Sequence, residues 1–187
     1  MKQNNWEKEF RARFEACEEE LRERYFSLYH DDELAWDYFT DMLYRCWKER
    51  RPSLKKQDRD RLQNPDWYRG HNLLGMLMYV NAFAGSLNGV REKLDYIEDC
   101  GVNYLHLMPI LESPKGRSDG GYAVADFRKI EPELGTMKDL DALARDCHKR
   151  GISLCLDFVM NHTSEDHEWA RRARAGDTEC QARYFFY

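Results

Sequence analysis

Three polar side chains come together where an apolar run ends in SLCLDFVMNHTS, residues 153–164. Asp157 interrupts the run itself, and Asn161 and His162 stand where it turns polar. An ionised carboxylate among apolar side chains is costly unless a cation or a hydrogen-bond donor pairs with it. We therefore expect Asp157 to have a partner or a function, and the surrounding elements must show which.

A metal site is one reading of these residues, but their spacing argues against it. Asp157, His162 and His167 recur at five-residue intervals, which suit neither one face of a helix nor a zinc pattern. The six cysteines show no CxxC spacing and most lie within apolar patterns, so we expect reduced thiols. We expect neither a metal nor another cofactor.

The overall composition limits the kinds of partner. With 42% hydrophobic residues, the 187-residue sequence can build a packed core. Lys and Arg number 29 against 34 Asp and Glu, and this net charge of −5 argues against a general nucleic-acid binder or a binder of anionic membranes. The first ten residues are too charged for a secretory signal, and no run reaches the roughly 18 apolar residues of a membrane span. We expect a cytoplasmic protein.

The first fifty residues have a helical pattern. Apolar residues recur at intervals of three and four over residues 6–28, which predicts an amphipathic helix. A second helix is predicted over residues 35–47, with Asp31 or Asp32 as its N-cap. The apolar residues of the first stripe are Trp6, Phe10, Phe14, Cys17, Leu21, Tyr25 and Leu28.

A polar segment separates this hairpin from the rest of the chain. Residues 51–70 are charged and interrupted by Pro52 and Pro65, so we place the connection between domains there. We expect a helical domain with its linker at residues 1–72 and a second domain at residues 73–187.

The second domain alternates between strand and helix. Apolar runs at 76–83, 102–110 and 153–160 predict buried strands, and residues 86–101 and 135–151 predict helices. This order implies right-handed parallel units, an α/β fold, with strands covered on both faces. In such folds the catalytic and ligand-binding residues lie at the carboxyl ends of the strands. The three polar segments at those ends are 81–86, 112–124 and 161–169, and the long loop over 110–135 points to function.

Five motifs in this order resemble those of amylosucrases in the α-amylase superfamily, glycoside hydrolase family 13. They are YVNAFAGSLNGV, YLHLMPIL, SDGGYAVADFR, GTMKDL and DFVMNHTSEDHEWA. NPDWY and the helical front end resemble the extra N-terminal helical domain of amylosucrases. The resemblance implies that residues 73–187 form the first three strand–helix units of a TIM (β/α)8 barrel, truncated after the third strand.

The activity that the resemblance implies is cleavage of sucrose with retention, followed by transfer of the glucosyl unit to an α-1,4-glucan or to water. That chemistry needs a nucleophilic carboxylate and a carboxylic acid about 5 Å apart. In this superfamily both follow later strands, so we assign no catalytic residue here and expect both to lie beyond residue 187. A whole barrel takes about 250 residues. We therefore expect an N-terminal fragment that is inactive alone.

The resemblance also implies roles for the SDGGY segment. Asp119 resembles the carboxylate at the floor of the glucosyl pocket, which pairs with an arginine from late in the chain. Tyr122 resembles the aromatic platform that stacks on the same ring and steadies positive charge in the transition state. Gly120 and Gly121 would permit the tight turn that presents both side chains.

Three residues of the DFVMNH segment take roles by the same resemblance. His162 resembles the histidine that donates a hydrogen bond to the 6-hydroxyl of the glucosyl ring. Asp157 resembles the aspartate that orients an arginine from a later strand, so we expect its charge to be exposed or uncompensated in this chain. Asn161 is a calcium ligand in calcium-dependent amylases. We expect a structural hydrogen bond from it instead.

Other functions share these motifs. A sucrose hydrolase would differ mainly in subsites encoded later in the chain. Trehalose synthases and oligo-1,6-glucosidases share DFVMNH but are less compatible with the helical front end and SDGGYAV. A non-catalytic sugar-binding module or helical interaction remnant is the alternative from a different class, and it predicts saturable binding by the isolated chain.

Overall fold

The structure is a computed structural model that describes residues 7–29 and 32–185. The chain divides into two compact units, Met1–Trp67 and Tyr68–Tyr187. This division falls a few residues before the domain boundary predicted at residues 72 and 73, which stays a prediction. Trp6 and Asp31 lie outside the described residues.

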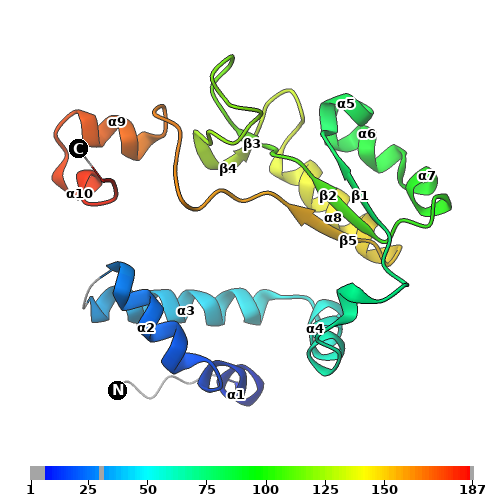
Figure 1. Cartoon of the computed structure of the whole chain (residues 1–187), viewed down its shortest axis with the longest axis horizontal. Coiled ribbons are helices and arrows are strands. Elements are labelled where there is room, and N and C mark those ends of the chain that lie inside the picture. Colours follow the sequence, from blue (N-terminus) through cyan, green and yellow to red (C-terminus); the bar gives the residue numbers. More distant parts are fainter. Residues whose placement is uncertain (1–6, 30–31, 186–187) are drawn as a thin grey trace. The chain divides into compact units, whose positions relative to one another are not determined.

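The first unit is helical (Figure 1). Its helices are α1 (Lys8–Glu15), α2 (Glu18–Tyr29), α3 (Glu33–Glu49) and α4 (Pro52–Gln63). The prediction of a single helix over residues 6–28 is wrong, because the helix is interrupted between α1 and α2. At the break the Cys17 amide donates to the Phe14 carbonyl at 2.9 Å, a three-residue contact that ends the α-helical ladder.

The sequence predicts the start of α3 correctly but does not predict α4. Asp32 caps α3 by accepting a hydrogen bond from the Ala35 amide at 2.9 Å, which confirms the second of the two predicted N-caps. The first half of the polar segment 51–70, where the connection between domains is predicted, forms α4, and the two compact units divide within this segment, after Trp67. Pro52 starts α4 without cost, since the first helical residue needs no donor. Arg50 pairs with Asp58 of α4 at 2.6 Å.

Aromatic side chains hold the helical unit together. Phe10, Phe14 and Trp36 are buried, and Phe39 and Trp47 pack against them. Ring centroids in this cluster lie about 5 to 6 Å apart, for example 5.7 Å between Phe10 and Trp47. Such tilted and stacked pairs add stability beyond the area they bury.

The second unit is built on a parallel sheet in the order β1-β2-β5. Its strands are β1 (Gly75–Met78), β2 (Tyr104–Leu107) and β5 (Ser153–Leu156). The predicted parallel α/β arrangement is confirmed. The strand predicted over residues 76–83 ends early, because Val80–Ala84 forms the short helix α5. Within the described residues the sheet is open, with β1 and β5 at its edges and no closed barrel.

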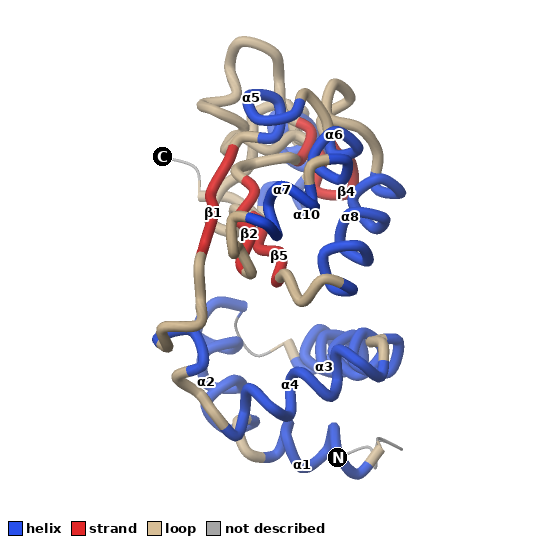
Figure 2. The backbone as a smooth tube through the Cα atoms, turned by 90° about the vertical axis from the view of Figure 1, so that its right-hand side faces the viewer, coloured by secondary structure: helices blue, strands red, loops and turns tan. Residues whose placement is uncertain are grey.

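Helices cover one face of this sheet (Figure 2). They are α6 (Leu87–Glu92), α7 (Leu94–Asp99) and α8 (Met137–Lys149). Met78, Leu105 and Leu107 point into that aliphatic core. On the other face Leu77 is 61% exposed, so the cover expected on both faces is wrong for the described part of the chain.

The helix predicted over residues 135–151 has the expected signals at both ends. Thr136 and Asp139 form a capping box at the start of α8, and Gly151 follows its end with a φ of 72°. The helix predicted over 86–101 is interrupted at Lys93, between α6 and α7, so that prediction is only partly right.

The segment 110–135 is not a simple loop. It contains the antiparallel strands β3 (Leu111–Glu112) and β4 (Asp126–Ile130), which pair with each other. After β5 the chain runs without helix or strand to α9 (Glu168–Arg174) and α10 (Thr178–Gln181), as the orange and red part of Figure 1 shows. Among the described residues, no helix has the length and apolar character needed to cross a membrane.

Candidate functional site

Asp157 is the first residue after β5, and both oxygens of its carboxylate have a partner. Oδ1 lies 2.9 Å from Nε2 of His106, and Oδ2 accepts a hydrogen bond from the hydroxyl of Tyr122 at 3.0 Å. A carboxylate only accepts hydrogen bonds, so the Nε2 atom of His106 must carry the hydrogen. The expectation that the charge of Asp157 is exposed or uncompensated is therefore wrong. The partners come from β2 and from the loop that follows it.

A left-handed turn presents Asp119 and Tyr122. The φ angles of Asp119, Gly120 and Gly121 are 48°, 70° and 96°, a conformation that glycine adopts without strain. At Gly121 a Cβ atom would lie 2.8 Å from Cβ of Pro109, so a side chain does not fit there. The expectation that these glycines permit the turn is confirmed.

The phenol of Tyr122 is held in its protonated form. Its pKa is raised above the ordinary value chiefly by the hydrogen bond to Asp157, then by desolvation and by the negative charge of that carboxylate. The negative charge of Asp119 makes a smaller contribution to this increase of the pKa. Tyr122 is therefore a hydrogen-bond donor at neutral pH, and Asp119 is an exposed carboxylate in the same turn.

Asn161 and His162 lie farther along the irregular segment after β5. Both side chains are exposed, and among the described residues the structure shows no hydrogen bond or ion pair for either. The structure therefore joins Asp157 to Tyr122, which shares its turn with Asp119, and within the described residues it shows no hydrogen bond or ion pair from His162 or Asn161 to them. Their assignment to the sugar site stays a prediction.

The loops after β2 and β5 are joined to each other. The Ser164 amide donates to the Val124 carbonyl at 2.8 Å. Arg117 forms ion pairs with Glu165 and with Asp166, the second at 2.7 Å. Two of the three segments predicted to hold chemistry thus lie side by side.

His167 has a structural role in the same region. Its Nδ1 atom accepts the Trp169 amide at 3.1 Å and so caps α9, and its ring lies 5.7 Å from that of Phe127. Burial lowers its pKa, which favours the neutral ring that this acceptor role needs. Within the described residues no three His, Cys, Asp or Glu side chains are placed to hold a metal ion.

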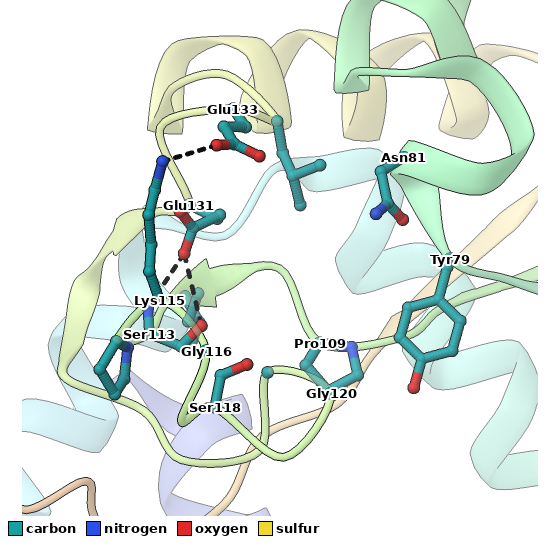
Figure 3. Close-up of a pocket in the computed structure, with 14 residues that line it drawn as sticks. Tyr79, Asn81, Pro109, Ser113, Lys115, Gly116, Ser118, Gly120, Glu131 and Glu133 are labelled. Atoms are coloured by element: carbon teal, nitrogen blue, oxygen red, sulfur yellow. Dashed lines mark hydrogen bonds and ion pairs between the residues drawn. The ribbon is translucent and has the colours of Figure 1, made fainter.

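A pocket of about 450 Å³ is lined in part by Ser118, Gly120 and Gly121 of the turn that bears Asp119 (Figure 3). Tyr79 and Asn81 lie across it from an ion pair between Lys115 and Glu133, whose atoms are 2.9 Å apart. Asp119, Tyr122 and Asp157 do not line this pocket. The pocket and the site around Asp157 therefore share the turn at residues 118–121 but not these three side chains.

Sequence reasoning missed His106. It is the polar residue of the strand YLHL, where Leu105 and Leu107 on either side are fully buried. The signal was available, because a lone histidine that alternates with buried leucines must face the other side of the sheet. In a parallel sheet that side leads to the end of β5, where Asp157 stands.

Comparison with known proteins decides the family. The model of the alpha amylase catalytic domain matches residues 52–187. The chain belongs to the alpha-amylase family. The match to this family begins at Pro52, the first residue of α4, so it includes part of the helical unit.

The names of the relatives in the alpha-amylase family indicate several different activities. Maltase 1 of Drosophila virilis is 36% identical over 150 residues, which cover 76% of this chain and 23% of the relative. Trehalose synthase of Pimelobacter sp. (strain R48) is 40% identical over 120 residues, 60% of this chain and 20% of the relative. A trehalose synthase thus matches far more of this chain than the DFVMNH segment.

A solved structure supports the same fold. The chain is 34% identical to a MutB variant crystallised with its substrate sucrose, with a TM-score of 0.53 over 59% of this chain and 20% of the other. The chain therefore spans about a fifth to a quarter of the length of these family members.

Proposed function

We propose that this chain is part of a retaining alpha-amylase-family enzyme that cleaves sucrose and passes the glucosyl unit to an α-1,4-glucan. The observation that carries the proposal is the hydrogen bond between Tyr122 and Asp157 at 3.0 Å. It fixes the turn that bears Asp119 against the carboxyl end of a parallel strand, where barrel enzymes bind substrate.

The two residues of the turn would act on the same sugar ring. Tyr122 offers an aromatic face for stacking, and its protonated hydroxyl, anchored on Asp157, keeps that face in place. A ring face near the anomeric carbon stabilises the positive charge that develops when the glycosidic bond breaks. Asp119 would accept hydrogen bonds from sugar hydroxyls at the floor of the pocket, because an ionised carboxylate is a strong acceptor.

His162 and Asn161 are assigned supporting contacts in this proposal. The exposed imidazole of His162 is available to donate to the 6-hydroxyl of the same ring. Asn161 would make a structural hydrogen bond. None of residues 1–187 is assigned as nucleophile or general acid, and the proposal needs no metal or cofactor.

A second candidate function is hydrolysis or isomerisation of another α-glucoside. The names of the relatives favour it, since they include a maltase and a trehalose synthase. A sucrose hydrolase fits the same turn equally well. These possibilities differ in the substrate and in the acceptor rather than in the roles of Asp119 and Tyr122.

The test uses the protein expressed from its complete reading frame. Purified enzyme is given sucrose, maltose or trehalose, with and without a glucan acceptor, and products are separated by chromatography. We expect fructose release and glucan elongation with sucrose. Turnover of maltose or trehalose without turnover of sucrose would reject the proposal in favour of the second candidate.

A variant tests the site. Asp119→Ala should lower kcat/KM for sucrose by about tenfold to a hundredfold, because it removes hydrogen bonds to a charged acceptor. Asp99→Ala, an exposed aspartate in α7, is the matched control. Turnover by Asp119→Ala close to that of the control would refute the role of Asp119.

A non-catalytic role makes a different prediction. Isothermal titration of the 187-residue chain with sucrose should show weak binding, because the chain would supply only part of the pocket wall. Tight, saturable binding by this chain alone would favour a sugar-binding module instead.

A further inference from the structure

His106 occupies the most constrained position of the site. It lies in β2, the middle strand, which pairs with β1 on one side and with β5 on the other. Its neighbours Leu105 and Leu107 are fully buried in the core on the opposite face. The backbone of His106 is therefore fixed by both ladders and by the core.

Asp157, in contrast, lies just outside the sheet. The ladder between β2 and β5 ends with the pair Leu107 and Leu156, one residue before Asp157. From this point to residue 185 the described backbone takes part in no strand pairing. The place of the Asp157 carboxylate then depends on its two hydrogen-bond partners, His106 and Tyr122.

Those two partners differ in rigidity. The imidazole of His106 comes from a strand, whereas the phenol of Tyr122 comes from a loop between β3 and β4. The side chains of His106 and Asp157 are 28% and 22% exposed, so their bond is partly shielded from water. Hydrogen bonds to a charged acceptor in such places are stronger than neutral ones.

We propose that His106 is a positioning residue for the sugar site. It holds the carboxylate of Asp157 at Oδ1, and Asp157 in turn holds the Tyr122 ring through Oδ2. This inference rests on the proposed function, in which the Tyr122 ring is the platform for the glucosyl unit. His106 itself does not contact the sugar.

The first test is spectroscopic and does not depend on activity. Nitrogen-15 NMR of the 187-residue chain, at a pH where the rings are neutral, should show the proton of His106 held on Nε2 more completely than that of His71, and Asp157→Ala should bring the tautomer ratio of His106 close to that of His71. His71, an exposed histidine in the turn before β1, is the internal control. A tautomer equilibrium at His106 that Asp157→Ala leaves unchanged would overturn the inference, whatever the protein catalyses.

The second test uses the protein expressed from its complete reading frame and the best α-glucoside found for it. His106→Phe keeps a flat ring but has no donor, so kcat/KM should fall about tenfold to a hundredfold. His106→Gln has an amide Nε2 at a similar reach and should restore kcat/KM to within a few-fold of the parent. His71→Phe is the control and should leave kcat/KM unchanged.

The outcomes separate the two hypotheses. Loss in His106→Phe with rescue in His106→Gln supports the positioning role. Equal loss in both variants shows that restoring a donor does not restore kcat/KM, and no loss in either shows that the bond is dispensable, so both results overturn the inference. If the parent has no activity on any α-glucoside, the proposed function fails while the spectroscopic test still decides the contact.

Discussion

The two compact units of this chain are stabilised by different kinds of core. In the helical unit, aromatic rings such as Phe14 and Trp36 fill the space between helices, and their partners are only partly buried. In the α/β unit, aliphatic side chains such as Leu105 and Leu143 are completely buried between sheet and helices. Every residue proposed to contact sugar lies in the α/β unit. A site of fixed geometry needs elements whose own backbones are fixed, and the parallel sheet supplies them.

The largest effects should come from the two cores. Trp36→Ala should lower the free energy of unfolding of the helical unit by about 3–5 kcal/mol, and Leu105→Ala that of the α/β unit by about 2–5 kcal/mol, because each leaves a cavity. Hydrogen exchange resolved by residue measures each unit separately. A loss confined to the wrong unit would contradict the assignment of the two cores.

A turn of the α/β unit should be the next most sensitive place. Gly121→Ala should destabilise by about 1–3 kcal/mol, because it combines a positive φ with a clash against Pro109. Gly116→Ala has a similar φ of 71° but open space around the new Cβ, so it isolates the cost of the backbone conformation. Urea denaturation compares the two variants. Equal losses would show that the contact with Pro109 is unimportant.

Removing the N-cap side chain should lower the free energy of unfolding by the same amount in both units. In each unit the side chain of the N-cap residue accepts a backbone amide of the first helical turn. Asp32→Ala in the helical unit and Thr136→Ala in the α/β unit should each lower stability by about 1 kcal/mol. Thermal unfolding followed by circular dichroism measures both changes. A cost at Thr136 well above that at Asp32 would indicate that the reciprocal bond from Asp139 adds to the cap.

Acid should weaken one ion pair in each unit. The hydrogen bond from Lys149, and then that from Arg91, lowers the pKa of Asp146 to about 2, and Arg50 lowers the pKa of Asp58 below its usual value. Because both folded pKa values are depressed, the stabilisation is present above about pH 4. It is lost as the pH falls toward about 2 for Asp146, and as the pH falls through its own depressed pKa for Asp58.

This pH dependence can be measured as a small difference between variants. Asp146→Asn should be less stable than the parent at pH 7, and the gap should narrow at pH 3. Asp99→Asn, at an exposed position of α7, is the control. A gap for Asp146→Asn that does not change with pH would show that the charge of Asp146 is not the source of the effect.

The sequence was most informative where a pattern repeats or a cap is present. Thr136 marks the start of α8, and the apolar runs mark β2 and β5. It was least informative at α4, since a helix that is polar on all sides has no stripe. Ion pairs one turn apart, such as Lys56 with Asp60 at 3.3 Å, occur there instead. The strand β3 has only two residues, too few for any period to show.

The motifs pointed to Tyr122 and Asp157 but not to their contacts. The structure joins these two residues by a hydrogen bond, and the roles assigned to Asp119, Asn161 and His162 in the site stay predictions. The bonds of Asp157 to Tyr122 and to His106 span 35 and 51 residues of sequence. Contacts at such separations follow from strand order and register, which local patterns do not specify.

The pairing of β3 with β4 has an entropic consequence for ligand binding. It ties the base of the segment 113–125, so the Asp119 turn belongs to a short closed arc instead of a long free loop. The bond between Val124 and Ser164 adds a second tie. Closing an arc during folding removes conformations that a ligand would otherwise have to remove on binding. In the proposed sugar site, affinity at this turn would thus be set partly by hydrogen bonds that no sugar touches.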